Sequence, residues 1–440
     1  MHQIKWLAVF ILFFIVNRGA SAQSRPVQLA PAIKNEVIDS LGSALLKKYI
    51  YPDTAAKMNS YIKERLKKGA YDAVDNPDDF AQMLDADLHT IYSDLHMRIY
   101  YNMGYEKDLR TKSYAASVIK RMQFLQAAKQ KNYGFQKVEI LNGNIGYISI
   151  AQFYNTNQEA TEIVKNAFLF LKNINALIID VRDNPGGEPD MVQYICSYFF
   201  KERTHLNDFY DRHAKTNEYW TEPVPASTIF STMPIYLLVN RRTGSAAEEF
   251  AYDLQNLHRV AIFGETTAGA AHWVTSNSIS NGFIGNIPFR KAVNPVTHKN
   301  WEKVGVKSDV KSDDEHALDN ALIYAYDHLI NTSTDLTLIK SLKWFRVAVN
   351  VKQHPVKIAI GTLKTFTGNY KGRLITLKNG KLYFTDTNGY HIGLTPFTAT
   401  AFMFTNNDRQ IEFIRSGKGK ITGFDFIYPG GKVERFNRLK

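Results

Sequence analysis

The chain has 440 residues, of which 45% are hydrophobic and 13% aromatic, and this length suits two or three domains with large cores. A single cysteine excludes an internal disulfide, so stability must come from those cores. The formal net charge is +12, and residues 340–440 hold 18 Lys and Arg against 5 Asp and Glu, so the rest of the chain is close to neutral.

The first residues are typical of a secretory signal peptide. Lys5 supplies the positive charge, the apolar run Trp6–Val16 is short for a membrane span, and Ala20-Ser21-Ala22 fits a cleavage site. We therefore expect export to the periplasm or the extracellular space, with residues 1–22 removed and Gln23 as the first mature residue. An uncleaved membrane anchor is the alternative.

Residues 23–100 are predicted to form a small helical domain. Apolar residues recur there at helical spacing, and Pro52 and Pro77 mark breaks at which new helices begin. The segment ends in Asp94-Leu95-His96-Met97, before the aromatic, strand-like Ile99-Tyr100-Tyr101. A basic, helix-like stretch from Tyr114 to Lys131 follows.

Residues 101–330 are predicted to form an α/β core, with a parallel-containing sheet and helices. Strand-like and helix-like segments alternate, and the strand at 176–181 is nearly continuously apolar, as in a parallel sheet covered on both faces. The carboxyl ends of such strands build the sites of α/β folds. Three of these ends carry glycine turns, at Gly186-Gly187, Gly244-Ser245 and Gly264 to Gly269.

The chain after residue 330 is predicted to hold a linker, residues 331–365, and a small antiparallel β domain, residues 366–440. Short alternating strands are separated there by Asn-Gly and other glycine turns, including Pro429-Gly430-Gly431, and Asn-Gly favours hairpins. The basic residues alternate with apolar ones, which favours a solvated sheet face over a nucleic-acid or membrane patch. No nucleic-acid partner is expected, and contact of the basic tail with a membrane surface stays open.

Ser245 lies where the apolar strand 235–239 gives way to a helix. The unpaired N–H groups at a helix start can stabilise an oxyanion beside a nucleophilic hydroxyl. The alternative role is a helix cap, because serine is a common N-cap and Glu248, three residues later, completes a capping box. The turn by itself leaves both roles open.

Five segments occur in order along the chain: Asn144-Ile145-Gly146-Tyr147-Ile148, Ile178 to Gly187, Thr243-Gly244-Ser245-Ala246-Ala247-Glu248, Gly264-Glu265-Thr266-Thr267-Ala268-Gly269 and Trp301-Glu302-Lys303-Val304-Gly305-Val306. Together they resemble the C-terminal-processing (tail-specific) serine proteases. The most similar branch is the one with interphotoreceptor-retinoid-binding-protein-like and tricorn-core members. The resemblance covers about Ile38 to Leu329 and implies a polypeptide substrate.

The resemblance implies that Ser245 is the nucleophile. It also implies that the amide of Ala246 is one oxyanion donor and that a glycine amide, from Gly186 or Gly187, is the second. One branch of the family pairs the serine with a lysine about 25 residues later, where this chain has Ala270. A methyl group cannot accept a proton, so that dyad is not expected.

The other branch uses a Ser–His–Glu arrangement, and the resemblance assigns His96 as the base and Glu302 as its supporting acid. Neutral imidazole is a competent base near neutral pH, and a carboxylate can orient it. A merely packed histidine and a solvated glutamate are the alternatives. His272, which ends the third glycine turn, is a second candidate base. Leu95 stands where the tricorn-type core has a serine, which puts a catalytic tetrad in doubt.

We therefore expect an exported serine endopeptidase that uses no cofactor and no metal, since the histidines lack metal-site spacing. Only about 40 residues separate His96 from the strand at Val138, too few for a PDZ insert. The alternative function is non-catalytic binding of apolar ligands or peptides on a degenerate protease core, because the lysine is absent and Leu95 replaces the serine. The oligomeric state stays open.

Overall fold

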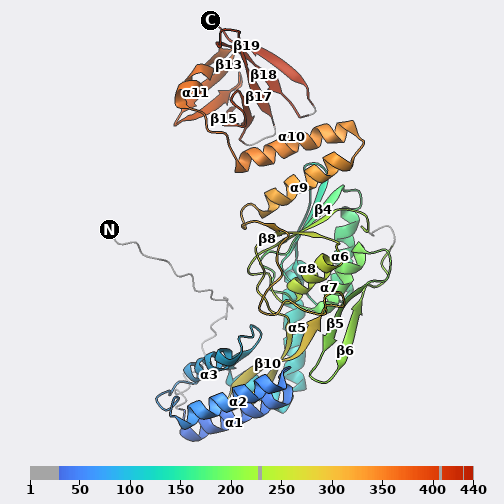
Figure 1. Ribbon diagram of the computed structural model, residues 1–440, viewed down its shortest axis with the longest axis vertical. Helices are drawn as coiled ribbons and strands as arrows, with labels where there is room; N and C mark the ends of the chain where they lie inside the picture. Colours follow the sequence, from blue (N-terminus) through green and yellow to red (C-terminus); the bar gives the residue numbers. More distant parts are fainter. Residues whose placement is uncertain (1–28, 226–229, 406–408, 430, 440) are drawn as a thin grey trace.

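The computed structural model describes residues 29–225, 230–405, 409–429 and 431–439 (Figure 1). The predicted signal peptide, residues 1–22, lies outside the described residues, as does Gly430 of the predicted turn. Along the chain follow N-terminal helices, a core with a mostly parallel sheet, and a C-terminal antiparallel near-barrel, so the predicted fold class is confirmed. Among the helices within the described ranges, none is long and apolar enough to cross a membrane.

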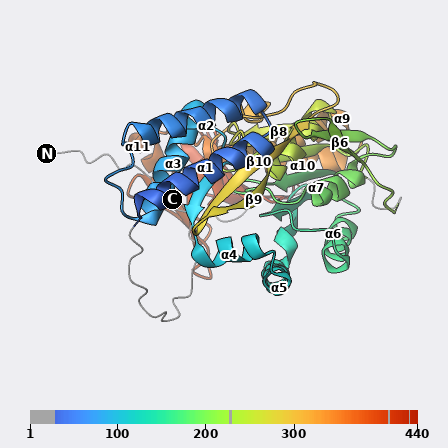
Figure 2. The ribbon, with the colours of Figure 1, turned by 90° about the horizontal axis from the view of Figure 1, so that it is seen from below.

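Three N-terminal helices, α1 (Pro31–Lys48), α2 (Pro52–Lys67) and α3 (Pro77–Ile91), each begin at a proline. Proline suits this position because an N–H in the first helical turn would have no partner within the helix, and proline has none. Their buried faces pack together and against Phe283 and Ile287 of the second sheet. Figure 2 shows α1 lying beside strands β9 (His272–Ser280) and β10 (Phe283–Val293), with α2 next to α1. The N-terminal helices therefore pack on the second sheet, which contains β9 and β10.

The central sheet has the strand order β11-β8-β7-β4-β3-β2. All its pairs are parallel except β2 with β3, which form an antiparallel edge. The strands are β2 (Phe135–Leu141), β3 (Ile145–Ile150), β4 (Ala176–Asp180), β7 (Ile235–Val239), β8 (Ala261–Gly264) and β11 (Val310–Lys311).

Helices cover both faces of the central sheet, and alternate strand residues point to each face. Leu177 and Ile179 pack with α6 (Gln158–Phe170), α7 (Pro189–Cys196, followed by the 3-10 turn Ser197–Phe199) and α8 (Ala246–Asn256). Ile178 and Leu238 pack with α9 (Ala317–Thr332) and α10 (Leu336–Gln353). Helix α10 occupies half of the segment predicted as a linker. Only Leu342 and Val351 of α10 are buried. A helix that buries so few side chains needs no regular spacing of apolar residues, which is why the sequence pattern there is weak.

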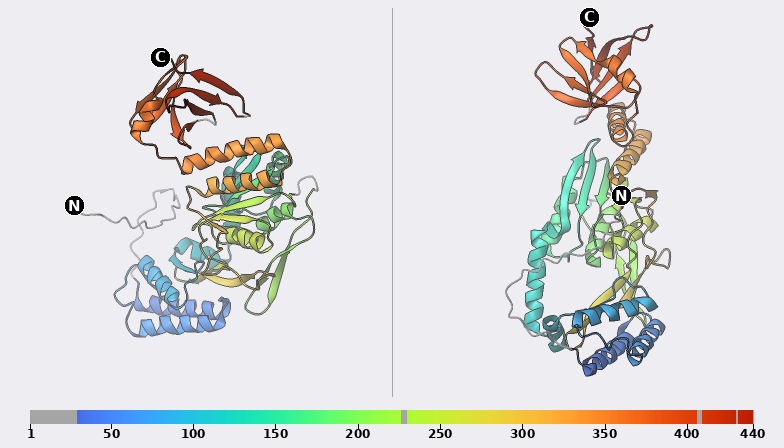
Figure 3. Two further views of the ribbon diagram at one scale, coloured as in Figure 1. Left: turned by 45° about the horizontal axis from the view of Figure 1, so that its top comes forward. Right: turned by 90° about the vertical axis from the view of Figure 1, so that its left-hand side faces the viewer.

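The second sheet joins the N-terminal helices to the central sheet. Its order is β1-β10-β5-β6, and β9 pairs with β10 outside this path. Helices α4 (Met103–Thr111) and α5 (Tyr114–Gln130) and a 3-10 turn (Asn132–Gly134) lead from β1 to β2, and Figure 3 shows α5 running along one side of the molecule. The remaining strands are β1 (Arg98–Tyr101), β5 (His205–Tyr210) and β6 (Lys215–Trp220).

The C-terminal part follows α11 (Ile360–Phe366) in the chain. It is one antiparallel sheet of eight strands, each paired with the next strand in the sequence. Its aromatic core includes Phe366, Phe402, Phe413 and Phe424. Its strands are β12 (Gly368–Tyr370), β13 (Arg373–Lys378), β14 (Lys381–Thr385), β15 (His391–Pro396), β16 (Ala401–Phe404), β17 (Gln410–Arg415), β18 (Ile421–Ile427) and β19 (Val433–Asn437).

Candidate active site

Ser245 lies at the end of the turn between β7 and α8. Its backbone adopts φ 52° and ψ −121°, a conformation that residues other than glycine rarely take and that often marks functional turns. Neighbouring contacts hold the turn in place: the Thr243 hydroxyl donates to the Val181 carbonyl at 2.9 Å, and the Gly244 N–H donates to the Asn184 carbonyl at 2.9 Å. The turns that follow β4 and β7 are therefore fastened together.

Glu248, which is 0% exposed, connects this turn to the loop after β8. Its Oε2 accepts the N–H groups of Ser245 at 2.9 Å and of Ala270 at 2.8 Å. Its Oε1 accepts the Gly269 N–H at 2.6 Å and the Thr267 hydroxyl at 2.5 Å. Burial raises the pKa of this carboxyl to about 7, although the four hydrogen bonds oppose the shift. The bond from the Ser245 N–H to Glu248 is the glutamate half of the capping box that the sequence suggested, and the same carboxyl also fixes Ala270.

The glycine turn after β4 approaches Ser245 very closely. A Cβ on Gly186 would lie 2.7 Å from both the Ala246 nitrogen and the Ser245 Cβ, and φ at Gly186 is +106°. The Gly186 N–H donates to the Asn184 side chain at 2.8 Å. No hydrogen bond within the described part of the chain engages the N–H of Gly187 or Ala246, and both residues line the cavity beside Ser245. Two backbone donors are thus available at this cavity.

His96 comes from the loop before β1 and reaches the serine, 149 residues further along the chain. Its Nε2 lies 3.1 Å from the Ser245 Oγ. Burial, opposed by the Asp94 carboxylate and assisted by the nearby His272 and Arg98, lowers the pKa of His96 to about 4. The imidazole is therefore neutral near pH 7. Its Nδ1 is buried and, within the described residues, has no hydrogen-bond partner.

Asp94 holds the second histidine, His272, at the start of β9. The Asp94 Oδ2 lies 2.7 Å from the His272 Nδ1 and accepts the Tyr49 hydroxyl at 3.1 Å, while Oδ1 accepts the His96 N–H at 3.1 Å. Burial acts to raise the pKa of Asp94, but the hydrogen bonds from His272 and the His96 N–H hold it below its usual range. The His272 Nε2 faces the Tyr51 hydroxyl at 3.3 Å. Both ring nitrogens of His272 thus have partners other than Ser245.

Glu302 lies next to His272. Its Oε2 accepts the Ala271 N–H at 2.9 Å and lies 3.7 Å from the His272 Nδ1, and its Oε1 is buried without a partner in the described residues. Burial raises the pKa of this carboxyl. No hydrogen bond joins Glu302 to His96 among the described residues. The structure thus brings Ser245, His96, Ala246 and Gly187 together, and joins Glu302 to the neighbouring His272 and Ala271.

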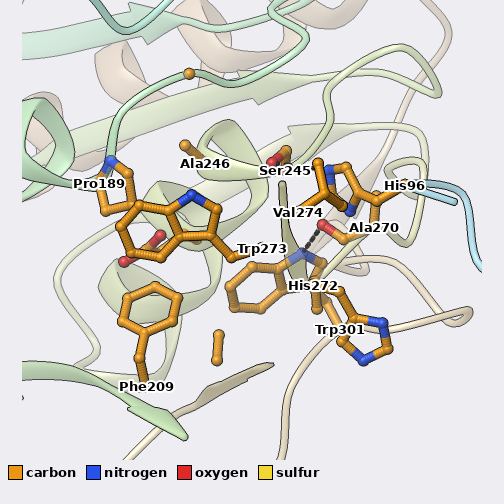
Figure 4. A pocket seen from close by; sticks show the side chains of 14 residues that line it. His96, Pro189, Phe209, Ser245, Ala246, Ala270, His272, Trp273, Val274 and Trp301 are labelled. Carbon is orange, nitrogen blue, oxygen red and sulfur yellow. Dashed lines mark hydrogen bonds between the residues drawn. The ribbon is translucent and has the colours of Figure 1, made fainter. Parts of the chain in front are cut away.

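A cavity of about 250 Å³ opens beside Ser245 (Figure 4). Ser245, Ala246 and His96 line one part of it, while Phe209, Pro189 and Trp273 line another. Trp301 donates its indole N–H to the Ala270 carbonyl at 2.9 Å, shown as the dashed line in Figure 4. Ala270, which stands where one branch of the family has its lysine, is therefore part of the cavity wall.

Two contributors to this site were not assigned roles from the sequence. Asp94 stands two residues before His96, a spacing that could have suggested a shared function. Glu249 directly follows Glu248 and lines the cavity, but a second acidic residue in a first helical turn is too common to single out. Asp94, His272 and Glu302 also bring potential metal-ligand atoms within 4.8 Å of one another, a grouping that sequence spacing does not reveal.

Comparison with known proteins agrees with this architecture. The model of peptidase family S41 matches residues 144–312, and the model of the N-terminal domain of peptidase S41 in eukaryotic IRBP matches residues 27–133. The chain therefore belongs to peptidase family S41, and the predicted resemblance is confirmed.

Among curated relatives, the chain is similar to the chloroplastic carboxyl-terminal-processing peptidase 2 of Arabidopsis thaliana, with 30% identity over 168 residues, 38% of this chain and 31% of that protein. It is also similar to the carboxy-terminal processing protease CtpA of Bacillus subtilis (strain 168), with 27% identity over 177 residues, 40% of this chain and 36% of that protein. The match thus spans about a third of each relative. Among solved structures, the tricorn protease is similar with TM-score 0.41 and 16% identity, over 71% of this chain and 37% of that chain.

Proposed function

We propose that this protein is an exported serine endopeptidase in which Ser245 attacks a peptide carbonyl and His96 accepts the serine proton. The observation that carries the proposal is the 3.1 Å separation of the His96 Nε2 and the Ser245 Oγ, at a helix start whose residues Ser245 and Ala246 line a cavity. Membership of family S41 supports a polypeptide substrate. Export rests on the sequence pattern of residues 1–22.

The reaction would proceed by acyl transfer. The Ser245 Oγ bonds to the carbonyl carbon while its proton moves to the His96 Nε2, and the amide N–H groups of Ala246 and Gly187 hold the oxyanion. His96 then gives its proton to the leaving amine, and water, activated by the same imidazole, releases the acyl group. Gly187 is favoured over Gly186 as second donor, because the Gly186 N–H already donates to Asn184.

His96 is favoured over His272 as the base. The ring nitrogens of His272 face Asp94 and Tyr51, whereas the His96 Nε2 faces the serine. Glu302 then supports the base indirectly, by holding the Ala271 amide and by approaching His272. Its direct contact with His96 would require a change on substrate binding.

A fluorophosphonate probe and an unfolded protein such as casein test the proposal on the mature protein. Wild type should be labelled and should degrade casein, and Ser245→Ala should do neither. His96→Ala should lose about 10²–10⁴-fold in rate, the usual contribution of a general base. Equal casein hydrolysis by wild type and Ser245→Ala would refute the nucleophile.

One observation favours the alternative of a non-catalytic binding protein. Among the residues that the structure describes, the buried His96 Nδ1 has no partner and Glu302 does not bond to it, so the predicted Ser–His–Glu chain of hydrogen bonds is incomplete there. On this alternative, the protein would bind apolar ligands or peptides in the cavity without turnover. Absence of probe labelling, together with saturable peptide binding, would favour it.

A further inference from the structure

The cavity beside Ser245 carries a chemical asymmetry that peptide-bond hydrolysis does not need. Its far walls are apolar and aromatic, from Pro189, Phe209, Trp273 and Ala292. One carboxyl group, that of Glu249, interrupts these walls. A single acid among aromatic side chains points to a ligand with an apolar stem and a polar end.

Glu249 is almost completely buried, with 4% of its surface exposed. It lies in the first turn of α8, four residues after Ser245 at the N-cap, and both residues line the cavity. Burial raises the pKa of Glu249 to about 7, a hydrogen bond from the Asn207 side chain opposes the shift, and the nearby Asp190 carboxylate adds to it. This buried, acidic environment is costly for a carboxylate that no cation neutralises, and a basic ligand group would relieve that cost.

A second acid continues the same helix face. Asp253 is 0% exposed, and its Oδ1 accepts the Asn294 side chain at 3.1 Å, while its Oδ2 has no partner in the described residues. The basic residues of the neighbouring strands pair with other acids: within the described residues, Lys215 and His205 pair with Asp208, and His272 pairs with Asp94. Arg290 stacks on Trp273, with its guanidinium carbon 5.5 Å from the ring centroid, and does not line the cavity.

We propose that this cavity receives the side chain on the acyl side of the scissile bond, and that Glu249 selects lysine or arginine there. The inference rests on the proposed function: a carbonyl held by the Ala246 and Gly187 amides lies at the cavity edge, so the side chain one bond away enters it. Phe209 and Trp273 cover the methylenes of a basic side chain, and the Glu249 carboxylate pairs with its cationic end.

An apolar side chain of the same length would cover Glu249 without supplying a hydrogen-bond donor. A buried acid left unpaired in this way disfavours binding, whereas a paired one favours it. The selectivity is therefore a difference between a satisfied and an unsatisfied carboxyl group, and it acts through binding of the substrate as well as of the transition state.

Two quenched peptides that differ at one residue, lysine or norleucine, test the inference on the mature full-length protein, with the cleaved bond located by mass spectrometry. Wild type should cleave after lysine with a kcat/KM at least about tenfold higher than after norleucine. Glu249→Gln should lose this preference. Glu162→Gln, which changes an exposed acid on α6, should retain it.

Inhibition of wild type by matched peptide aldehydes, ending in argininal or norleucinal, provides a measurement that needs no variant. The argininal should bind at least about tenfold more tightly. Equal cleavage after both residues, equal inhibition by both aldehydes, or an unchanged preference in Glu249→Gln would overturn the inference while Ser245 is still labelled by the probe. Loss of labelling and cleavage altogether would overturn the proposed function instead, and this inference with it.

Discussion

Asp94 and His272, 178 residues apart in the sequence, form a buried pair with 2.7 Å between the Asp94 Oδ2 and the His272 Nδ1. Both side chains are 0% exposed. The pair fixes the loop that carries His96 against the start of β9, because Asp94 also accepts the His96 N–H. The position of the proposed base thus depends on a contact between the N-terminal part and the core.

Asp94→Asn should lower kcat/KM by roughly 10²-fold, since misplacement of a catalytic group by about 1 Å has this effect. The amide keeps the volume, but its NH₂ group cannot accept the hydrogen bonds that the two carboxylate oxygens form with His272, Tyr49 and the His96 N–H, so the loop and His96 should shift. Peptide hydrolysis and probe labelling measure the loss. Asp39→Asn, at an exposed ion pair with Lys63, is the control. Unchanged rates in Asp94→Asn would contradict a positioning role.

The pH at which activity falls on the acid side should reflect the low pKa of His96. Only neutral imidazole accepts the serine proton, and burial lowers its pKa to about 4. The rate of probe labelling should therefore persist as the pH falls from 7 to about 5 and reach half its plateau near pH 4. Circular dichroism at each pH checks that the fold survives. Half-loss near pH 6.5, the value of an exposed histidine, would show that burial does not control this group.

Glu248→Gln should destabilise the core by about 1–3 kcal/mol, the cost of leaving a buried donor unpaired. Glu248 accepts three backbone N–H groups, from Ser245, Gly269 and Ala270. A glutamine NH₂ group cannot accept, so either orientation leaves at least one of them without a partner. Denaturant unfolding measures the change. Glu64→Gln, at an exposed ion pair, should leave stability unchanged; the same shift in both variants would refute the argument.

Gly186→Ala should abolish probe labelling. The new Cβ would lie 2.7 Å from the Ala246 nitrogen and from the Ser245 Cβ, so the serine turn must move away. Gly244→Ala is the matched control, because a Cβ there meets nothing closer than the Pro185 carbonyl at 3.5 Å. Gly244→Ala should be labelled within about threefold of wild type. Equal labelling of both alanine variants would show that the close approach at Gly186 is not required.

Local patterns predicted most of the fold correctly. Pro52 and Pro77 marked the starts of α2 and α3, and the apolar runs at 176–181 and 235–239 became the buried strands β4 and β7. These signals depend on residues within one or two turns of each other, which is why a sequence displays them. Helix α10 was not predicted, and its residues were assigned to a linker, because only two of its side chains are buried and its apolar pattern is weak.

The site divides in the same way. The sequence by itself determined that a serine lies between a buried strand and a helix, with Glu248 three residues later and a glycine turn after β4. Only the tertiary structure decided that the His96 Nε2 reaches Ser245, that Glu302 bonds to Ala271, that Asp94 holds His272, and that Glu249 faces the cavity. The reason is physical: the chain encodes turns and caps locally, whereas side chains about 150 residues apart meet only through the packing of two sheets and the helices upon them.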